Sequence, residues 1–132
     1  MDWSAGFSEK FAYMDKEHEA LAAKLQDVKT MPEGGEGGGP KFEALKFLRM
    51  LKEHVGNEEA TMECYQYPER ELHKKHHEIL LESVECIIEF FDVAAMAVNR
   101  ERIVNHIENR LSEELFVDSR LASFLRAQHE AM

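Results

Sequence analysis

Glycine and proline interrupt this chain at very few places, and this strongly restricts what it can fold into. Proline occurs only at positions 32, 40 and 68, and five of the seven glycines lie between Gly34 and Gly39. Residues 32–40 therefore predict a flexible loop, because these two residue types break regular structure. Neither side of this loop shows the apolar–polar alternation of a strand. We expect the chain to be helical almost throughout.

Apolar residues recur with the helical period in four segments of the chain. The first segment runs from about residue 11 to 29 and the second from about 42 to 64, a third follows Pro68, and a fourth begins near Asn99. Four amphipathic helices joined by short connections favour an all-α fold, an up-down-up-down four-helix bundle.

The bundle occupies about residues 11–116 in this interpretation, within a single domain of residues 1–132. Two alternatives stay open for residues 117–132. They form a short C-terminal fifth helix, or they serve as a contact surface for a partner protein.

The charge balance excludes two classes of partner. The 132 residues include 26 acidic and 16 basic side chains, which gives a formal net charge of -10. Such an excess of negative charge argues against a nucleic acid or an anionic membrane surface as partner. No apolar run approaches the ~18 residues of a spanning helix, and the N-terminus lacks the layout of a signal peptide. We therefore expect a cytoplasmic protein.

The polar residues that interrupt the apolar stripes are mostly histidines, of which the chain has seven. A lone inward histidine is more often a hydrogen-bonded core residue than a ligand. Burying so many polar groups without partners would cost about 1–3 kcal/mol each, whereas a metal ion satisfies them together. Neutral imidazole suits iron, zinc and copper, and a carboxylate among several imidazoles favours iron or another hard-to-borderline ion. The candidate ligands on the predicted inward faces are His18, His54, Glu58, His73, His77 and His106.

Several motifs around these positions resemble one known family. The motifs are Trp3 twelve residues before Asp15, then Glu17-His18 and Leu21; His54-x-x-x-Glu58-Glu59-x-x-Met62; Tyr67-Pro68; His73-x-x-x-His77; and Ile103-Val104-Asn105-His106-Ile107. Together they resemble the hemerythrin family, and most of all its bacterial branch, the bacteriohemerythrins. The resemblance covers about residues 3–115.

The resemblance implies a non-heme di-iron centre (Fe2+/Fe3+) with an oxo or hydroxo bridge. It implies His73, His77 and His106 on one iron, His18 and His54 on the other, and Glu58 between them. Dioxygen or another small ligand would bind at an open position on the two-histidine iron, in a pocket lined by Ile107 and Leu111. Asp15, Glu59 and Asn105 are expected to orient a turn or an imidazole rather than to bind metal.

One position departs from the family pattern. The family has a second bridging aspartate five residues after its last histidine, and the corresponding residue here is Leu111. Glu108, Glu113 and Glu114 are the nearby carboxylates, and helix geometry favours none of them, so we expect all three to be solvated. Without a second carboxylate the centre would carry one more positive charge.

Two functional classes follow from the resemblance. The first is reversible dioxygen binding for storage, delivery or sensing, which would not be enzymatic. The second is a di-iron redox enzyme with oxidase, peroxidase or nitric oxide chemistry on the same site. We also expect a monomer, with a redox or signalling protein as a further partner.

Overall fold

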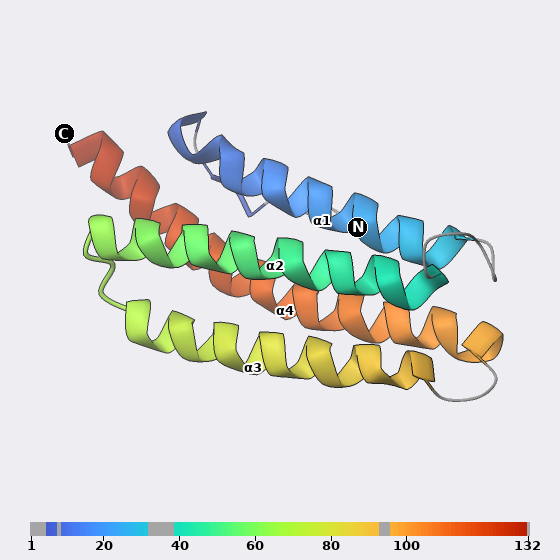
Figure 1. The fold of residues 1–132 in the computed structure, drawn as a ribbon. Coiled ribbons are helices and arrows are strands. Elements are labelled where there is room, and N and C mark those ends of the chain that lie inside the picture. The colour runs from blue at the N-terminus through green and yellow to red at the C-terminus, as the bar shows by residue number, and fades with distance from the viewer. Residues whose placement is uncertain (1–4, 8, 32–38, 93–95, 132) are drawn as a thin grey trace.

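The computed structural model describes residues 5–7, 9–31, 39–92 and 96–131. Within them the chain forms four α-helices, each antiparallel to the one before it (Figure 1). The helices are α1 (Ala12–Thr30), α2 (Gly39–Cys64), α3 (Arg70–Glu89) and α4 (Met96–Ala131), with short 3-10 turns η1 (Glu9–Phe11) and η2 (Phe90–Asp92). The predicted all-α four-helix bundle is confirmed. Trp3 and most of the predicted loop, residues 32–38, lie outside the described residues.

The fourth helix is longer than we expected. It runs without a break from Met96 to Ala131, so residues 117–131 are not a separate fifth helix. The buried residues Leu121 and Leu125 continue the stripe that begins at Ile103 and Ile107, which explains why the helix continues. The predicted end of the bundle near residue 116 is therefore too early.

Apolar side chains form two core clusters, one toward each end of the bundle. The larger cluster includes Leu51 and Val55 of α2 and Ile107 and Leu111 of α4. The smaller one consists of Phe11, Met62, Tyr67, Leu121 and Leu125. Along both α2 and α4, the buried residues between the two clusters are polar: Glu58 and Thr61 in α2, and Glu114 and Asp118 in α4.

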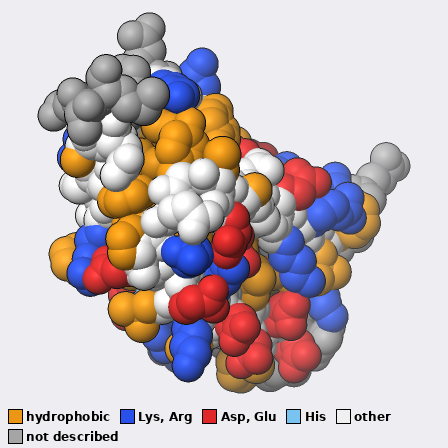
Figure 2. Space-filling model, turned by 90° about the vertical axis from the view of Figure 1, so that its left-hand side faces the viewer, with side chains coloured by type: hydrophobic (Ala, Val, Ile, Leu, Met, Phe, Trp, Pro, Cys, Tyr) orange, Lys and Arg blue, Asp and Glu red, His pale blue; other side chains and the backbone are white. Residues whose placement is uncertain are grey.

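Figure 2 views the bundle from the end at which α2 stops and α3 begins. Hydrophobic side chains gather in the upper middle of this face, and acidic and basic side chains share its lower part. The smaller cluster closes the bundle here, with Phe7, Tyr65 and Phe124 partly buried against it. No helix among the described residues is both long and apolar enough to cross a bilayer.

The turn between α2 and α3 is a Schellman motif that fixes the direction of the chain before α3. The backbone N–H of Tyr67 donates to the Met62 carbonyl (2.9 Å), and that of Gln66 donates to the Glu63 carbonyl (3.3 Å). Gln66 has a φ of 53°, a conformation that glycine adopts more readily than other residues. Pro68 lies within this turn, two residues before α3 begins at Arg70.

We predict that Gln66→Gly raises the free energy of unfolding by about 0.5–1 kcal/mol, because it relieves the positive φ. Thermal or urea unfolding measures this change. Gln66→Ala is the matched control, since it keeps the Cβ but loses the hydrogen bond from Gln66 Nε2 to the Glu63 carbonyl (2.9 Å). The alanine variant should not be stabilised, and equal stabilisation in both variants would contradict the backbone explanation.

Candidate metal centre

All four helices contribute buried polar side chains to the layer between the two apolar clusters. Each of these side chains belongs to a residue with at most 5% of its surface exposed. They are His18 of α1, His54 and Glu58 of α2, His73 and His77 of α3, and Glu114 and Asp118 of α4. Helices α2, α3 and α4 each contribute two of these residues, four positions apart, and this spacing places both on one face of the helix.

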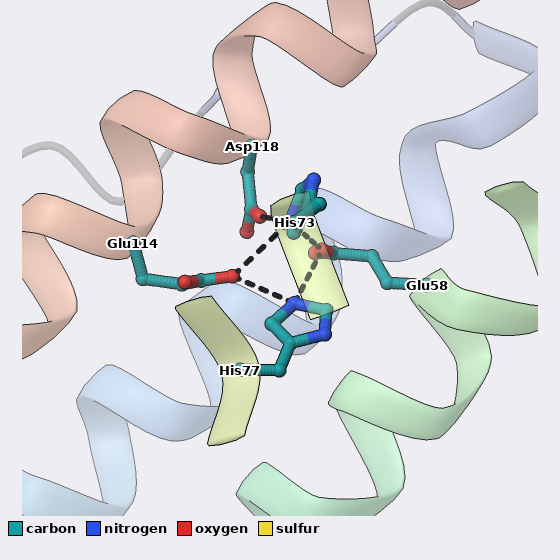
Figure 3. A group of neighbouring side chains, drawn as sticks. All are labelled: Glu58, His73, His77, Glu114 and Asp118. Carbon is teal, nitrogen blue, oxygen red and sulfur yellow. Dashed lines mark hydrogen bonds and ion pairs between the residues drawn. The ribbon is translucent and has the colours of Figure 1, made fainter. Parts of the chain in front are cut away.

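One half of the layer combines two imidazoles with three carboxylates (Figure 3). His77 Nε2 lies 2.8 Å from Glu114 Oε1 and 3.2 Å from Glu58 Oε1. His73 Nε2 lies 2.9 Å from Asp118 Oδ1 and 3.0 Å from Glu58 Oε1. One donor atom from each of the five residues lies within 4.8 Å of all the others.

The other half combines two imidazoles with two carboxylates. The Nε2 atoms of His18 and His54 are only 3.0 Å apart. His18 Nε2 lies 2.9 Å from Asp118 Oδ2, and His54 Nε2 lies 2.8 Å from Glu58 Oε2. These four residues also offer donor atoms within 4.8 Å of one another.

Glu58 and Asp118 belong to both halves. Each presents one oxygen to His73 and the other to the imidazoles of α1 and α2. The layer is therefore two adjacent donor sets that share two carboxylates, one set with five donors and the other with four.

Carboxylates outside the layer orient three of the four imidazoles. His18 Nδ1 lies 3.2 Å from Asp15 Oδ1, His54 Nδ1 lies 2.8 Å from Glu17 Oε1, and His77 Nδ1 lies 2.8 Å from Glu59 Oε2. Such contacts fix the rotation of the ring and leave its Nε2 atom directed inward. The structure agrees with the orienting role expected for Asp15 and Glu59, and it adds Glu17.

His106 was predicted to be a ligand, but the structure does not bring it to the layer. Its side chain is exposed, about a quarter turn from the buried stripe of α4. It is also about 12 Å short of Glu114 along the helix axis. Glu114 stands beside His77 instead, although we expected it to be solvated.

The expected loss of the second carboxylate is also wrong. Leu111 is buried in the larger apolar cluster together with Ile107, and Asp118 supplies the carboxylate, seven residues further along α4. Of the other two candidates, Glu113 is exposed, as expected, whereas Glu108 is half-buried but lies outside the layer.

A signal for Asp118 and Glu114 was present in the sequence. Residues 107, 111, 114, 118, 121 and 125 form one continuous helical stripe, and its two acidic members lie between apolar ones.

The charges in the layer strongly perturb its titrations. Burial by itself would lower the pKa of His54, but contacts with Asp118 and Glu17 raise it to about 12. The pKa of His73 is likewise raised to about 12 and that of His77 to about 10, against the opposing effect of burial. Burial would raise the pKa of Glu58, yet the imidazoles beside it hold that pKa well below its usual range.

Burial would also raise the pKa of Asp118, but contacts with His18, His54 and His73 lower it. The buried carboxylates therefore require positive charge next to them. Protons on the imidazoles supply this charge in the absence of metal, and metal ions can replace those protons.

The donor chemistry fits transition-metal ions. Imidazole nitrogens and carboxylate oxygens are the ligands that iron prefers in non-heme sites. The Nδ1 atoms of His18 and His54 both face carboxylates, which favours a proton on Nδ1 in each neutral ring. Their unprotonated Nε2 atoms would then face each other at 3.0 Å, an arrangement that a cation between them stabilises. Buried Glu58 Oε2 also has no aligned hydrogen-bond donor, although an imidazole nitrogen lies close to it.

Comparison with known proteins gives one distant likeness. The chain is 24% identical over 106 residues to a myohemerythrin from Theromyzon tessulatum, a match that covers 80% of this chain and 83% of that protein. No protein-family model matches the chain, and no solved structure matches it. The likeness supports the resemblance found in the sequence, at a distance.

We predict that the metal-free protein loses stability as the pH rises above neutrality. The imidazoles have pKa values above the 6.5 of the unfolded chain, so their contribution is complete below pH 6.5 and declines toward pH 10–12. Each excess proton of the folded state contributes a slope of about 1.4 kcal/mol per pH unit. The carboxylates act in the opposite sense, but only in acid, where Glu58 and Asp118 become protonated.

Chemical unfolding between pH 6 and 9 after treatment with a chelator measures this slope. Metal-loaded protein is the control, and it should not lose stability over the same range, because its imidazoles are already neutral. A metal-free profile that does not fall with pH would show that the layer holds no excess protons.

Proposed function

We propose that this hemerythrin-like chain holds two iron ions in the buried layer and binds dioxygen at one of them. The observation that carries the proposal is that the two donor sets contain different numbers of residues, five in one and four in the other. His73, His77 and Glu114 serve one set alone, whereas only His18 and His54 serve the other alone. The set with fewer donors leaves room for an external ligand.

The proposed assignment follows from these donor sets. His73, His77 and Glu114 would hold one ion, His18 and His54 would hold the other, and Glu58 and Asp118 would contact both. An oxo or hydroxo bridge between the ions belongs to the same proposal. Iron, when bound, supplies the electrons for reversible dioxygen binding.

The chain's own residues would keep the ligand position dry. The ring of Phe7 lies 6.4 Å from the ring of His18, on the side with fewer donors. Ile107 and Leu111 are buried in the apolar cluster adjoining the layer, and we propose that they line the ligand pocket. Apolar walls exclude the water that would promote loss of an electron from the metals.

The physiological roles proposed for such a site are oxygen storage, delivery or sensing in the cytoplasm. A redox or signalling protein would then be the partner that uses the bound oxygen or responds to it.

Glu114 favours a second candidate function, a di-iron redox enzyme. Two divalent ions carry four positive charges, and the carboxylates of Glu58, Glu114 and Asp118 remove three of them. A site with a third carboxylate in place of an imidazole stabilises the more oxidised metals. Easier oxidation of the metals would favour electron transfer out of the site over reversible binding.

We predict that protein prepared with iron contains two iron ions per chain. The ferrous form should develop a visible absorption band with dioxygen, and this band should disappear when oxygen is removed. Metal analysis and absorption spectroscopy measure both properties. Irreversible conversion to the ferric form would favour the redox enzyme, and protein that retains no iron would contradict both functions.

Asp118→Asn tests the assignment of the shared carboxylate, because it keeps the shape of the side chain but removes its charge. Iron content should fall from two ions to one or fewer. Glu113→Gln is the matched control on the same helix, since the side chain of Glu113 is 72% exposed, and this variant should retain both ions. Equal iron content in the two variants would show that Asp118 does not bind metal.

We predict that Glu114→Gln raises the reduction potential of the iron-loaded protein by about 60 mV or more, a tenfold change in a one-electron equilibrium. Glutamine keeps an oxygen next to His77 but removes one negative charge from the layer. A spectroscopic redox titration measures the potential, again with Glu113→Gln as control. Glu114→His, which restores a fifth imidazole, should shift the potential in the same direction, and unchanged potentials would show that Glu114 only orients His77.

A further inference from the structure

Helix α3 carries apolar side chains on its outer face as well as on its inner one. Leu72 is 54% exposed, Ile79 is 61% exposed, and Phe90, immediately after the helix, is 57% exposed. Cys86 is exposed in the same region. The inner face is separate and contains His73, His77, Leu80, Val84 and Ile88. In Figure 1, α3 lies at the margin of the bundle.

These outer residues follow the spacing of a coiled-coil seam. The positions alternate in steps of four and three: Leu72, His76, Ile79, Ser83, Cys86 and Phe90. This spacing keeps side chains on one stripe over several turns, and such a stripe typically packs against another helix. No element among the described residues buries Leu72, His76, Ile79 or Cys86.

Two opposite charges, seven residues apart, flank this stripe. Lys75 and Glu82 are both exposed, seven residues apart, and so lie along the same flank of the stripe. Neither has an ion pair within the described part of the chain, although the neighbouring Lys74 pairs with Glu63 and Glu85 pairs with Lys52. Lys75 therefore lies before Ile79, near the midpoint of the stripe, and Glu82 lies after it.

We propose that the outer stripe of α3 binds the same stripe of a second copy of this chain, with the two helices antiparallel and Ile79 at the two-fold axis. In that arrangement residues whose numbers sum to about 158 face each other. Lys75 of each copy then meets Glu82 of the other, and Leu72 of each copy meets Cys86 of the other. A single helix face that supplies both members of each pair is self-complementary, as a two-fold interface requires.

With this interface the chain would form a dimer, rather than the monomer that we expected from the sequence. The polar residues His76 and Ser83 in the seam make the association reversible rather than permanent, because polar seam residues reduce the stability of helix pairs. The metal layer faces the inner side of α3, so two copies would bind without covering it.

Sedimentation over a concentration series tests the proposal on the purified protein. The mass should rise from the 15.3 kDa of one chain toward twice that value. Ile79→Glu should keep the protein monomeric at every concentration, because it places two like charges at the axis. Leu45→Glu is the matched control: Leu45 is also an exposed leucine, 43% exposed on α2, and its replacement should not change association.

The charge pair and the orientation have separate tests. Lys75→Glu should weaken association at least tenfold, and the double variant with Glu82→Lys should restore it. In a Cys64→Ser background, Leu72→Cys should form a disulfide with Cys86 of the second copy under mild oxidation. These two residues of one chain are about 21 Å apart along the helix, so they cannot join within a copy.

Three outcomes would overturn the proposal. A protein that is monomeric at all concentrations has no such interface, and association that survives Ile79→Glu uses another surface. Efficient crosslinking of Cys86 to Cys86 without Leu72→Cys would establish a parallel arrangement instead.

Discussion

The placement of Glu58 and Asp118, two fully buried carboxylates, is the constraint on which the rest of this structure depends. An isolated carboxylate in a protein interior is so unfavourable that it must be neutralised or paired. Here the pairing comes from four imidazoles on three helices, and each carboxylate contacts at least three of them. The mutual positions of the helices at this level are therefore set by charge as well as by apolar packing.

The two apolar clusters complete this arrangement. They lie on either side of the polar layer and keep water from it, so that the electrostatic interactions inside it are strong. Outer carboxylates such as Glu17 and Glu59 then hold the imidazoles from behind. A bundle with only apolar residues at these positions would be simpler to fold, and the retention of so many charged groups indicates a function for the layer.

Much of this could be predicted from the sequence, because helices and their inward faces follow from local periodicity. The four-helix bundle is an example, and so are five of the buried polar residues, His18, His54, Glu58, His73 and His77. Asp118 and Glu114 were missed because an acidic residue on a helix is usually solvated, and only the partner helices show that these two are not. His106 was misplaced because a short motif fixes neither the phase nor the height of a helix relative to its neighbours. The length of α4 is likewise a matter of tertiary packing, since its last turns are stabilised by contacts with the end of the bundle.

The sharing of two carboxylates has a consequence for the order in which the layer can be filled. The first ion to enter would draw on the charge of Glu58 and Asp118 and also fix their side chains. The second would therefore meet ligands that are already positioned but less negative. By linkage, each ion changes the affinity of the other by the same factor. If two ions bind, their affinities would therefore be coupled through Glu58 and Asp118, the two carboxylates that both sets share.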